Sequence, residues 1–227
     1  MRIDMWMDTA CPWCYLGLRH LRAALSAFSH GDQVEVVLRA HVLEPDLEGP
    51  VDTPRAAHLA RTAGMEPEAV AEEDERLRAL GRAEGVVFDF ESLVVAPTSR
   101  AHRVIAAAGE ADIDAGATTG PDTAHLKAAE AIMRAHFEMG LDVSDPDVLI
   151  GCAQDIGLGA AVAAGALADG RWASQGYSDQ QMGVGMGVDA LPTYILGSRF
   201  VVQDRLSATA MANVLTTAWA HSREDGR

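Results

Sequence analysis

Two cysteines separated by two residues stand where a short apolar run gives way to an amphipathic one. The first run is Ile3 to Met7, and the pair lies in Cys11-Pro12-Trp13-Cys14. After the pair, apolar residues recur at three- and four-residue spacing as far as Phe28, which predicts a helix. Residues 34–39 are mostly apolar and β-branched, which predicts a buried strand. The chain therefore begins as strand, helix, strand, with the cysteine pair at the start of the helix.

This order places Cys11 at a reactive edge. Parallel strands joined by a crossover helix form a right-handed βαβ unit, and ligands of α/β folds bind at its carboxyl edge. A cysteine in the first turn also meets unpaired N–H groups and the positive end of the helix dipole, which stabilise a thiolate. We therefore expect Cys11 to be the nucleophile of a disulfide-exchange centre.

The other residues of the motif suit the same chemistry. Cys14 falls on the same helix face as Cys11, about 5–6 Å away between Cβ atoms, so we expect it to be the resolving thiol. Pro12 fits the first helical position, and Trp13 offers a flat apolar surface to a substrate. The expected centre needs no cofactor beyond the Cys11–Cys14 disulfide and an external thiol donor or acceptor.

The middle of the chain has a helical composition and no strong strand. Residues 113–121, rich in Gly, Ala, Thr and Asp, predict a loop. The predicted helices cover residues 54–64, 67–84, 99–109, 123–140, 146–156 and 168–182.

The sheet pattern returns near the C-terminus. Thr193 to Leu196, a turn at Gly197-Ser198, and Arg199 to Val202 predict a β-hairpin, and residues 207–220 predict a closing helix. Without the helical block the order is βαβ then ββα, which predicts an α/β, thioredoxin-like fold with a large all-helical insertion between its two halves. The predicted thioredoxin-like domain covers residues 1–48 and 187–227, and the inserted helical domain covers residues 49–186.

Leu191-Pro192 predicts the second wall of the site. A proline that opens a sheet strand is tolerated at an edge or a first position, and a cis bond there is usually functional. In thioredoxin-like folds the proline at this place faces the two cysteines. From this similarity we expect Pro192 to be cis and to face the cysteines, with the Leu191 backbone pairing with an extended substrate.

The composition and charge of the chain limit the kinds of molecule that we expect it to bind. The formal charge is −15, from 33 acidic and 18 basic residues, and no basic block interrupts it, which argues against nucleic acid or an anionic membrane surface. No run is long and apolar enough for a transmembrane helix, and the acidic N-terminus does not resemble a signal peptide. Three cysteines in such a chain fit a reducing compartment, so we expect a cytoplasmic protein, and the single lysine hints at a GC-rich bacterial genome.

Nearly the whole chain resembles the FrnE-type branch of the DsbA family of dithiol-disulfide oxidoreductases. The matching stretches are Ile3 to Trp6 leading into residues 11–17, Glu35 to Val37 with Arg39, Ala101-His102-Arg103, and residues 187–188 leading into 191–194. The resemblance implies a thioredoxin domain with a helical insertion, a nucleophilic Cys11 and a resolving Cys14. Leu191 departs from the valine, and Pro97 from the asparagine, that relatives commonly carry, which leaves the contacts to substrate open.

Other interpretations of the same residues remain. His102 is either a structural histidine or a group that faces the dithiol and contacts the substrate side. The two cysteines could form half of a zinc site, but no second Cys pair or His-x₃₋₅-His is present, and we expect no metal.

Two further function classes compete with disulfide exchange on proteins or small molecules. A glutathione- or other thiol-dependent transferase or isomerase is one, since the related hydroxychromene-carboxylate isomerase and kappa-class branch shares the fold. Members of that branch typically carry serine at the first cysteine position, so the retained Cys11 and Cys14 count against it. A non-catalytic binding module is the other, and an intact dithiol disfavours it.

Overall fold

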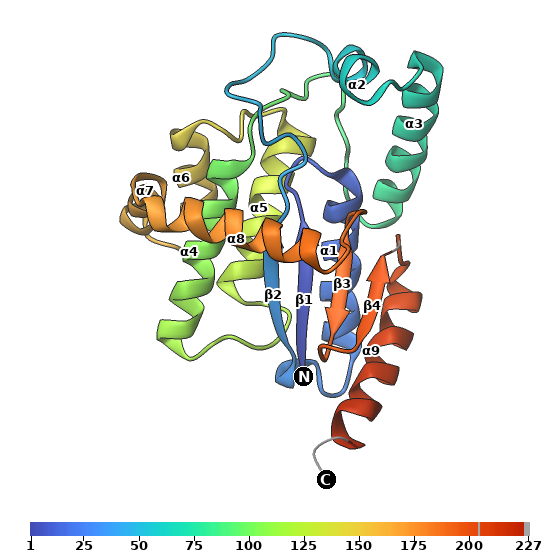
Figure 1. The fold of residues 1–227 in the computed structure, drawn as a ribbon, viewed down its shortest axis with the longest axis vertical. Helices are drawn as coiled ribbons and strands as arrows, with labels where there is room; N and C mark the ends of the chain where they lie inside the picture. Colours follow the sequence, from blue (N-terminus) through green and yellow to red (C-terminus); the bar gives the residue numbers. More distant parts are fainter. Residues whose placement is uncertain (204, 225–227) are drawn as a thin grey trace.

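The computed structural model describes residues 1–203 and 205–224, and its strands form one mixed sheet (Figure 1). The strand order is β2-β1-β3-β4, with β1 at Arg2–Met7, β2 at Glu35–Ala40, β3 at Thr193–Leu196 and β4 at Phe200–Gln203. β1 pairs with β2 in parallel and with β3 antiparallel, and β3 pairs antiparallel with β4. The predicted thioredoxin-like α/β fold is thereby confirmed.

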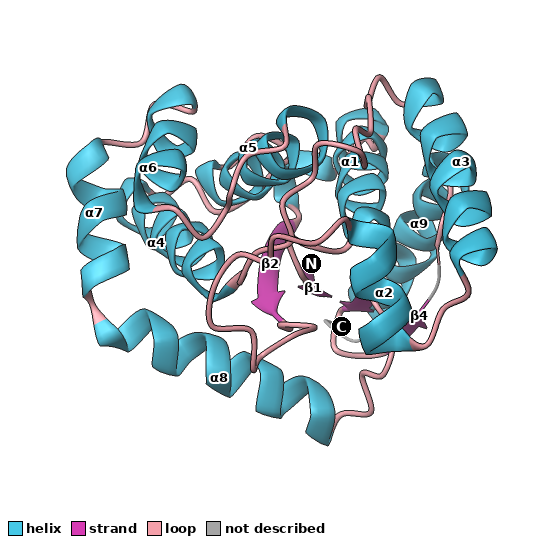
Figure 2. Ribbon diagram, turned by 90° about the horizontal axis from the view of Figure 1, so that it is seen from above, coloured by secondary structure: helices cyan, strands magenta, loops and turns pink. Residues whose placement is uncertain are grey.

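Successive side chains of β1 pack on opposite faces of the sheet. Ile3, Met5 and Met7 belong to the main core with α1 (Pro12–Ala27) and α9 (Ala208–Glu224), whereas Trp6 packs with Val188 and Ile195 on the other face. Successive side chains of a strand point to opposite faces, so both faces of β1 are buried. Figure 2 shows α8 (Gly170–Gly185) on one side of the strands and α1 and α9 on the other.

The middle of the chain is helical, as predicted. A short 3₁₀ turn, Gly31–Gln33, precedes β2. The remaining helices are α2 (Arg55–Ala63), α3 (Pro67–Ala83), α4 (Ser99–Ala115), α5 (Ala124–Met139), α6 (Pro146–Asp155) and α7 (Ala160–Ala168).

The structure differs from the prediction at three places in this region. α4 continues to Ala115, so the loop predicted at residues 113–121 starts only after the helix ends at Gly116, whose φ is 66°. The stretch of Ala and Gly before residue 168 forms α7, because its Ala163 and Ala166 are buried against neighbouring helices. The helix predicted at 168–182 is α8, displaced to Gly170–Gly185.

The division into two domains stays a prediction. The strands lie at both ends of the chain, and α2 to α8 lie between them in sequence. Asp204 and residues 225–227, which belong to the predicted C-terminal segment, lie outside the described residues. Within the described residues, no helix is long and apolar enough to cross a membrane.

α8 lies against the sheet through a glycine and two polar contacts. Arg39 on β2 pairs with Asp179 on α8 at 2.7 Å and with Asp4 on β1 at 2.9 Å. The Trp6 indole N–H donates to the Asp179 carbonyl at 2.9 Å. A Cβ at Gly183 would stand 2.6 Å from the Trp6 indole nitrogen, so only glycine fits there without a shift.

We expect Gly183→Ala to lower the free energy of unfolding by about 1–3 kcal/mol, because the added methyl group overpacks the contact with Trp6. Urea denaturation followed by circular dichroism measures it. Gly176→Ala is the matched control, since a Cβ there meets only the Ala40 Cβ at 3.7 Å. That variant should be as stable as the parent or more stable by up to about 1 kcal/mol. Equal stability of the two variants would show that the Trp6 contact is not tight.

Candidate active site

A tight turn delivers Cys11 to the start of α1. β1 ends at Met7, and the Cys11 N–H donates to the Asp8 carbonyl at 3.1 Å. Cys11 is the N-cap residue of α1, and Pro12 takes the first helical position. No side chain caps this helix end and its first turn contains no acidic residue, so the N–H groups there are left for the Cys11 sulfur.

The two cysteines are reduced and unequal. Cys11 is 7% exposed, whereas Cys14 is 0% exposed. The Cys14 thiol donates a hydrogen bond to the Cys11 sulfur, which outweighs burial and lowers the pKa of Cys11. Burial, followed by the interaction with Cys11, raises the pKa of Cys14 well above its ordinary value. Cys11 is therefore the thiol that ionises first and the one that solvent reaches.

Asp8 connects His102 to this turn. The Asp8 side chain is 1% exposed and accepts hydrogen bonds from His102 Nε2 at 3.3 Å and from the Leu43 N–H at 2.7 Å. Burial opposes the charge, but these donors prevail and lower the pKa of Asp8. His102, on α4, thus reaches the dithiol through Asp8, and its predicted contact with substrate stays a prediction. The sequence analysis missed Asp8, whose only signal was a polar residue directly after an apolar strand.

Leu191-Pro192 lies next to the helix that carries the two cysteines. The peptide bond is cis, as predicted. A Cβ at Gly17, one turn after Cys14 on α1, would lie 3.0 Å from Pro192 Cγ and 2.3 Å from the Tyr194 hydroxyl. Pro192 therefore packs against the helix that carries both cysteines, and pairing of the Leu191 backbone with a substrate stays a prediction.

Side chains from two other segments hold Trp13. Its indole N–H donates to Glu73 on α3 at 3.0 Å. The guanidinium groups of Arg76 and Arg205 lie 5.3 and 3.9 Å from its ring centroid. Such cation–π contacts hold the ring in place, and contact of Trp13 with a substrate stays a prediction.

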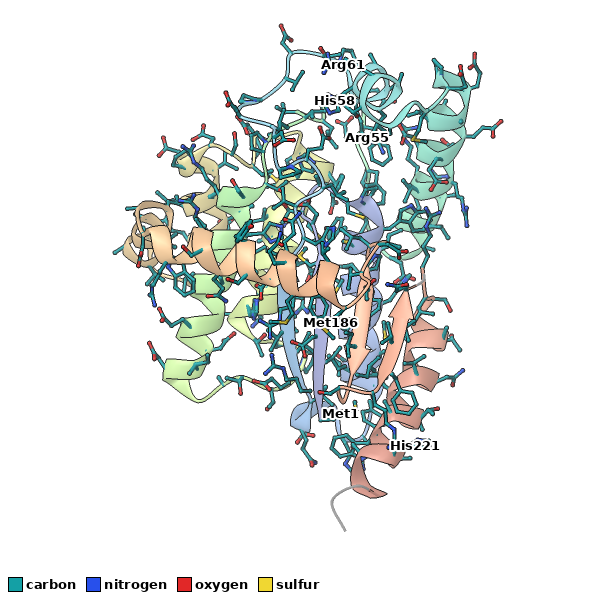
Figure 3. All side chains as sticks on the ribbon, in the orientation of Figure 1. Met1, Arg55, His58, Arg61, Met186 and His221 are labelled. Carbon is teal, nitrogen blue, oxygen red and sulfur yellow. The ribbon has the colours of Figure 1, made fainter. Side chains whose placement is uncertain are left out.

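A cavity of about 170 Å³ opens beside Cys11 and Pro12. Arg55 and His58 reach it from α2, and Figure 3 shows both at the end of the molecule opposite Met1 and His221. Arg55 pairs with Asp74, and His58 pairs with Glu44 at 2.7 Å. The remaining wall consists of Asp8, Ala10, Leu43, Leu47, Leu59, Leu93, Val95, Ala96, Thr98 and His136.

About half of the residues that line this cavity come from the predicted insertion. Burial lowers the pKa of His136 to about 4, so its ring is neutral at pH 7 and adds no charge. The wall thus combines apolar side chains with a few fixed polar groups, which is the usual make-up of a small-molecule pocket. Within residues 1–203 and 205–224, no group of three or more His, Cys, Asp or Glu side chains is placed to hold a metal ion.

Comparison with known proteins identifies the family. The family model described as the DSBA-like thioredoxin domain matches residues 2–214. The chain belongs to this family. The predicted resemblance to DsbA proteins is confirmed at that level, although no curated protein sequence matches the chain.

Solved structures agree with the assignment. A probable DsbA oxidoreductase from Streptomyces coelicolor is 28% identical, with a TM-score of 0.81 over 97% of this chain and 90% of that one. The cytosolic disulfide reductase DsbM from Pseudomonas aeruginosa, solved with GSH, is 18% identical, with a TM-score of 0.67 over 97% of this chain and 100% of that one. A 2-hydroxychromene-2-carboxylate isomerase is 12% identical, with a TM-score of 0.60 over 100% of this chain and 98% of that one. The last two likenesses show the shared fold.

The pKa values predict which cysteine reacts. At pH 7 iodoacetamide should alkylate Cys11 before Cys14 or Cys152, because the pKa of Cys11 is lowered and burial raises the pKa of Cys152 to about 11. Cys14→Ala removes the donor to Cys11, so the Cys11 pKa rises and its alkylation at pH 7 slows by about tenfold per pKa unit. Cys152→Ala is the control and should leave the rate unchanged. Peptide mass spectrometry over time measures each site, and an unchanged rate in Cys14→Ala would refute the hydrogen bond as the cause.

Proposed function

We propose that this chain is a dithiol-disulfide oxidoreductase that exchanges disulfides through Cys11 and Cys14. The observation that carries the proposal is the asymmetry of the pair: a slightly exposed, low-pKa Cys11 at a helix N-terminus and a fully buried, high-pKa Cys14 one turn further on. Membership of the DSBA-like family supports it. The partners are protein or small-molecule thiols and disulfides.

The reductive half-reaction has two displacements. The Cys11 thiolate attacks one sulfur of the substrate disulfide, a Cys11–substrate bond forms, and the first substrate sulfur leaves as a thiolate. Cys14 then loses its proton and attacks the Cys11 sulfur, so the Cys11–Cys14 bond forms while the second substrate sulfur leaves. The two electrons and two protons end on the substrate, and the centre is oxidised. The same steps in reverse oxidise a substrate dithiol, so an external thiol donor or acceptor closes the cycle.

A substrate disulfide would enter between two walls. In this proposal the start of α1 is one wall, and Pro192, whose bond to Leu191 is cis, is the other. Leu191 lies two residues before the start of β3, and we propose that its backbone pairs with an extended substrate segment. A sequence with only three cysteines suits a reducing compartment, and we place the activity in the cytoplasm on that ground.

A second candidate keeps the dithiol but takes a small molecule, and the cavity beside Cys11 favours it. About 170 Å³ of partly apolar space adjoins the nucleophile, enough for a compact thiol or disulfide but not for a folded chain. The DsbM structure was solved with GSH, which makes a small thiol a natural substrate to test. A thiol-dependent transferase or isomerase remains the variant of this candidate that would not cycle the dithiol.

Cysteine variants test the exchange cycle. Cys11→Ser should reduce the rate of insulin disulfide reduction by at least about a hundredfold, because the attacking thiolate is lost. Cys14→Ala should instead accumulate a mixed disulfide on Cys11, visible on a non-reducing gel and by mass. Cys152→Ala should keep full activity. Full activity of Cys11→Ser would refute the proposed roles.

Filling the cavity tests the small-molecule candidate. Leu59→Trp should raise the KM for 2-hydroxyethyl disulfide by about tenfold if that substrate occupies the cavity, since the larger ring takes up its space. Val162→Trp adds the same ring on an exposed position of α7 and should change nothing. Equal KM values in the two variants would argue that substrates bypass the cavity.

A further inference from the structure

The Tyr194 hydroxyl is a buried polar group without a hydrogen-bond partner. The side chain is 1% exposed, and no atom of the described residues bonds to its oxygen. A buried hydroxyl left unpaired costs roughly 1–3 kcal/mol, and phenylalanine would fill the same space without that cost. Unsatisfied groups of this kind are rare and call for an explanation.

The hydroxyl lies against α1, one helix turn from Cys14. Tyr194 sits on β3, paired with Met5 of β1, two residues after cis-Pro192. Its oxygen is 2.3 Å from where a Cβ of Gly17 would be, so any side chain at position 17 would take its place. Gly17 and Cys14 are three residues apart on α1 and therefore share a helix face.

The phenol remains a proton donor there. The pKa of Tyr194 is raised well above its ordinary value. Burial is the largest cause, and the charges of Cys14 and then of Cys11 follow. The phenol therefore keeps its proton at neutral pH. No acceptor among the described residues occupies its hydrogen, which rotates about the C–O bond and so is available to a sulfur that becomes negative and moves within reach.

The reaction creates a need for such a donor. In the resting dithiol, the Cys14 thiol donates to Cys11. Once Cys11 is bonded to a substrate it carries no charge, and the fully buried Cys14 must become a thiolate. A buried anion is costly unless a donor meets it.

We propose that Tyr194 is a catalytic residue of the resolving step, whose O–H donates to the Cys14 sulfur as the thiolate forms. This inference rests on the proposed exchange cycle. The tyrosine keeps its proton, the Cys14 proton passes to water as the thiolate forms, and the substrate sulfur departs as a thiolate that water then protonates. The new Cys11–Cys14 bond forms as the Cys11–substrate bond breaks. Because the hydrogen bond is made only when Cys14 is charged, it accelerates this step without stabilising the resting dithiol.

Stopped-flow mixing of the reduced protein with 5,5′-dithiobis(2-nitrobenzoate) separates the two displacements. Attack by Cys11 releases one equivalent of the yellow thiolate, and resolution by Cys14 releases the second. In Tyr194→Phe the first phase should keep its rate within about twofold, and the second should slow by about tenfold, as expected for loss of one hydrogen bond to a charged group. Cys14→Ala should show the first phase alone.

Tyr15→Phe is the matched control, since it also removes one phenol oxygen from this protein. The Tyr15 hydroxyl donates to Glu138 at 2.5 Å, so its loss should lower the free energy of unfolding and leave both phases unchanged. Tyr194→Phe should be as stable as the parent or more stable, because it removes an unpaired oxygen. A merely structural tyrosine would give the opposite result, a loss of stability with both phases intact.

The outcomes separate the inference from the function on which it rests. If the parent protein gives no second phase, the exchange cycle itself fails. If the parent gives both phases and Tyr194→Phe resolves at the same rate, the cycle stands and the role of Tyr194 is refuted. If both phases slow equally in Tyr194→Phe, the hydroxyl acts on Cys11, and the assignment to Cys14 is likewise refuted.

Discussion

The turn from Asp8 to Cys11 is the constraint on which the site depends. Its backbone bond, from the Cys11 N–H to the Asp8 carbonyl, ends β1 and starts α1 within four residues. The Asp8 carboxylate accepts hydrogen bonds from the Leu43 N–H, in the segment after β2, and from the His102 ring on α4. One residue therefore ties the first strand, the second strand and the helical region together directly behind the nucleophile. The local geometry of Cys11 and the placement of the helices are for this reason not independent.

The sequence predicted the parts whose causes are local. The strands, the first helix and the hairpin followed from periodicity and turn residues, whereas the cis bond at Pro192 also needed the similarity to thioredoxin-like folds. α7 was missed because its Ala and Gly residues give no amphipathic pattern, and burial by neighbouring helices decides its fold. α4 extends beyond its predicted end because residues 110–115 are compatible with a helix. The helix ends at Gly116, whose backbone has the left-handed conformation.

The site was predictable only in part, for a similar reason. The cysteine spacing is a local signal, but the importance of Asp8 depends on His102, and that of Gly17 depends on Tyr194. These partners come from distant positions, and one sequence contains no sign that they meet. Trp13 shows the same limit, because the motif indicates an exposed ring, whereas Glu73, Arg76 and Arg205 from two other segments hold it. The roles of Pro12, Trp13, Leu191, Pro192 and His102 toward a substrate stay predictions.

The pairing of β1 with β3 has a consequence for the order in which the protein is made. Ile3 lies opposite Leu196, and Trp6 opposite Thr193, so the central strand finds this neighbour only when nearly the whole chain exists. Contacts so distant in sequence form late, because a long loop must close first. During synthesis from the N-terminus, both thiols are thus present long before the wall that carries Pro192 and Tyr194. In the nascent chain the two cysteines are therefore not yet covered by β3 and the segment that carries Pro192. The site is complete only when the sheet has formed.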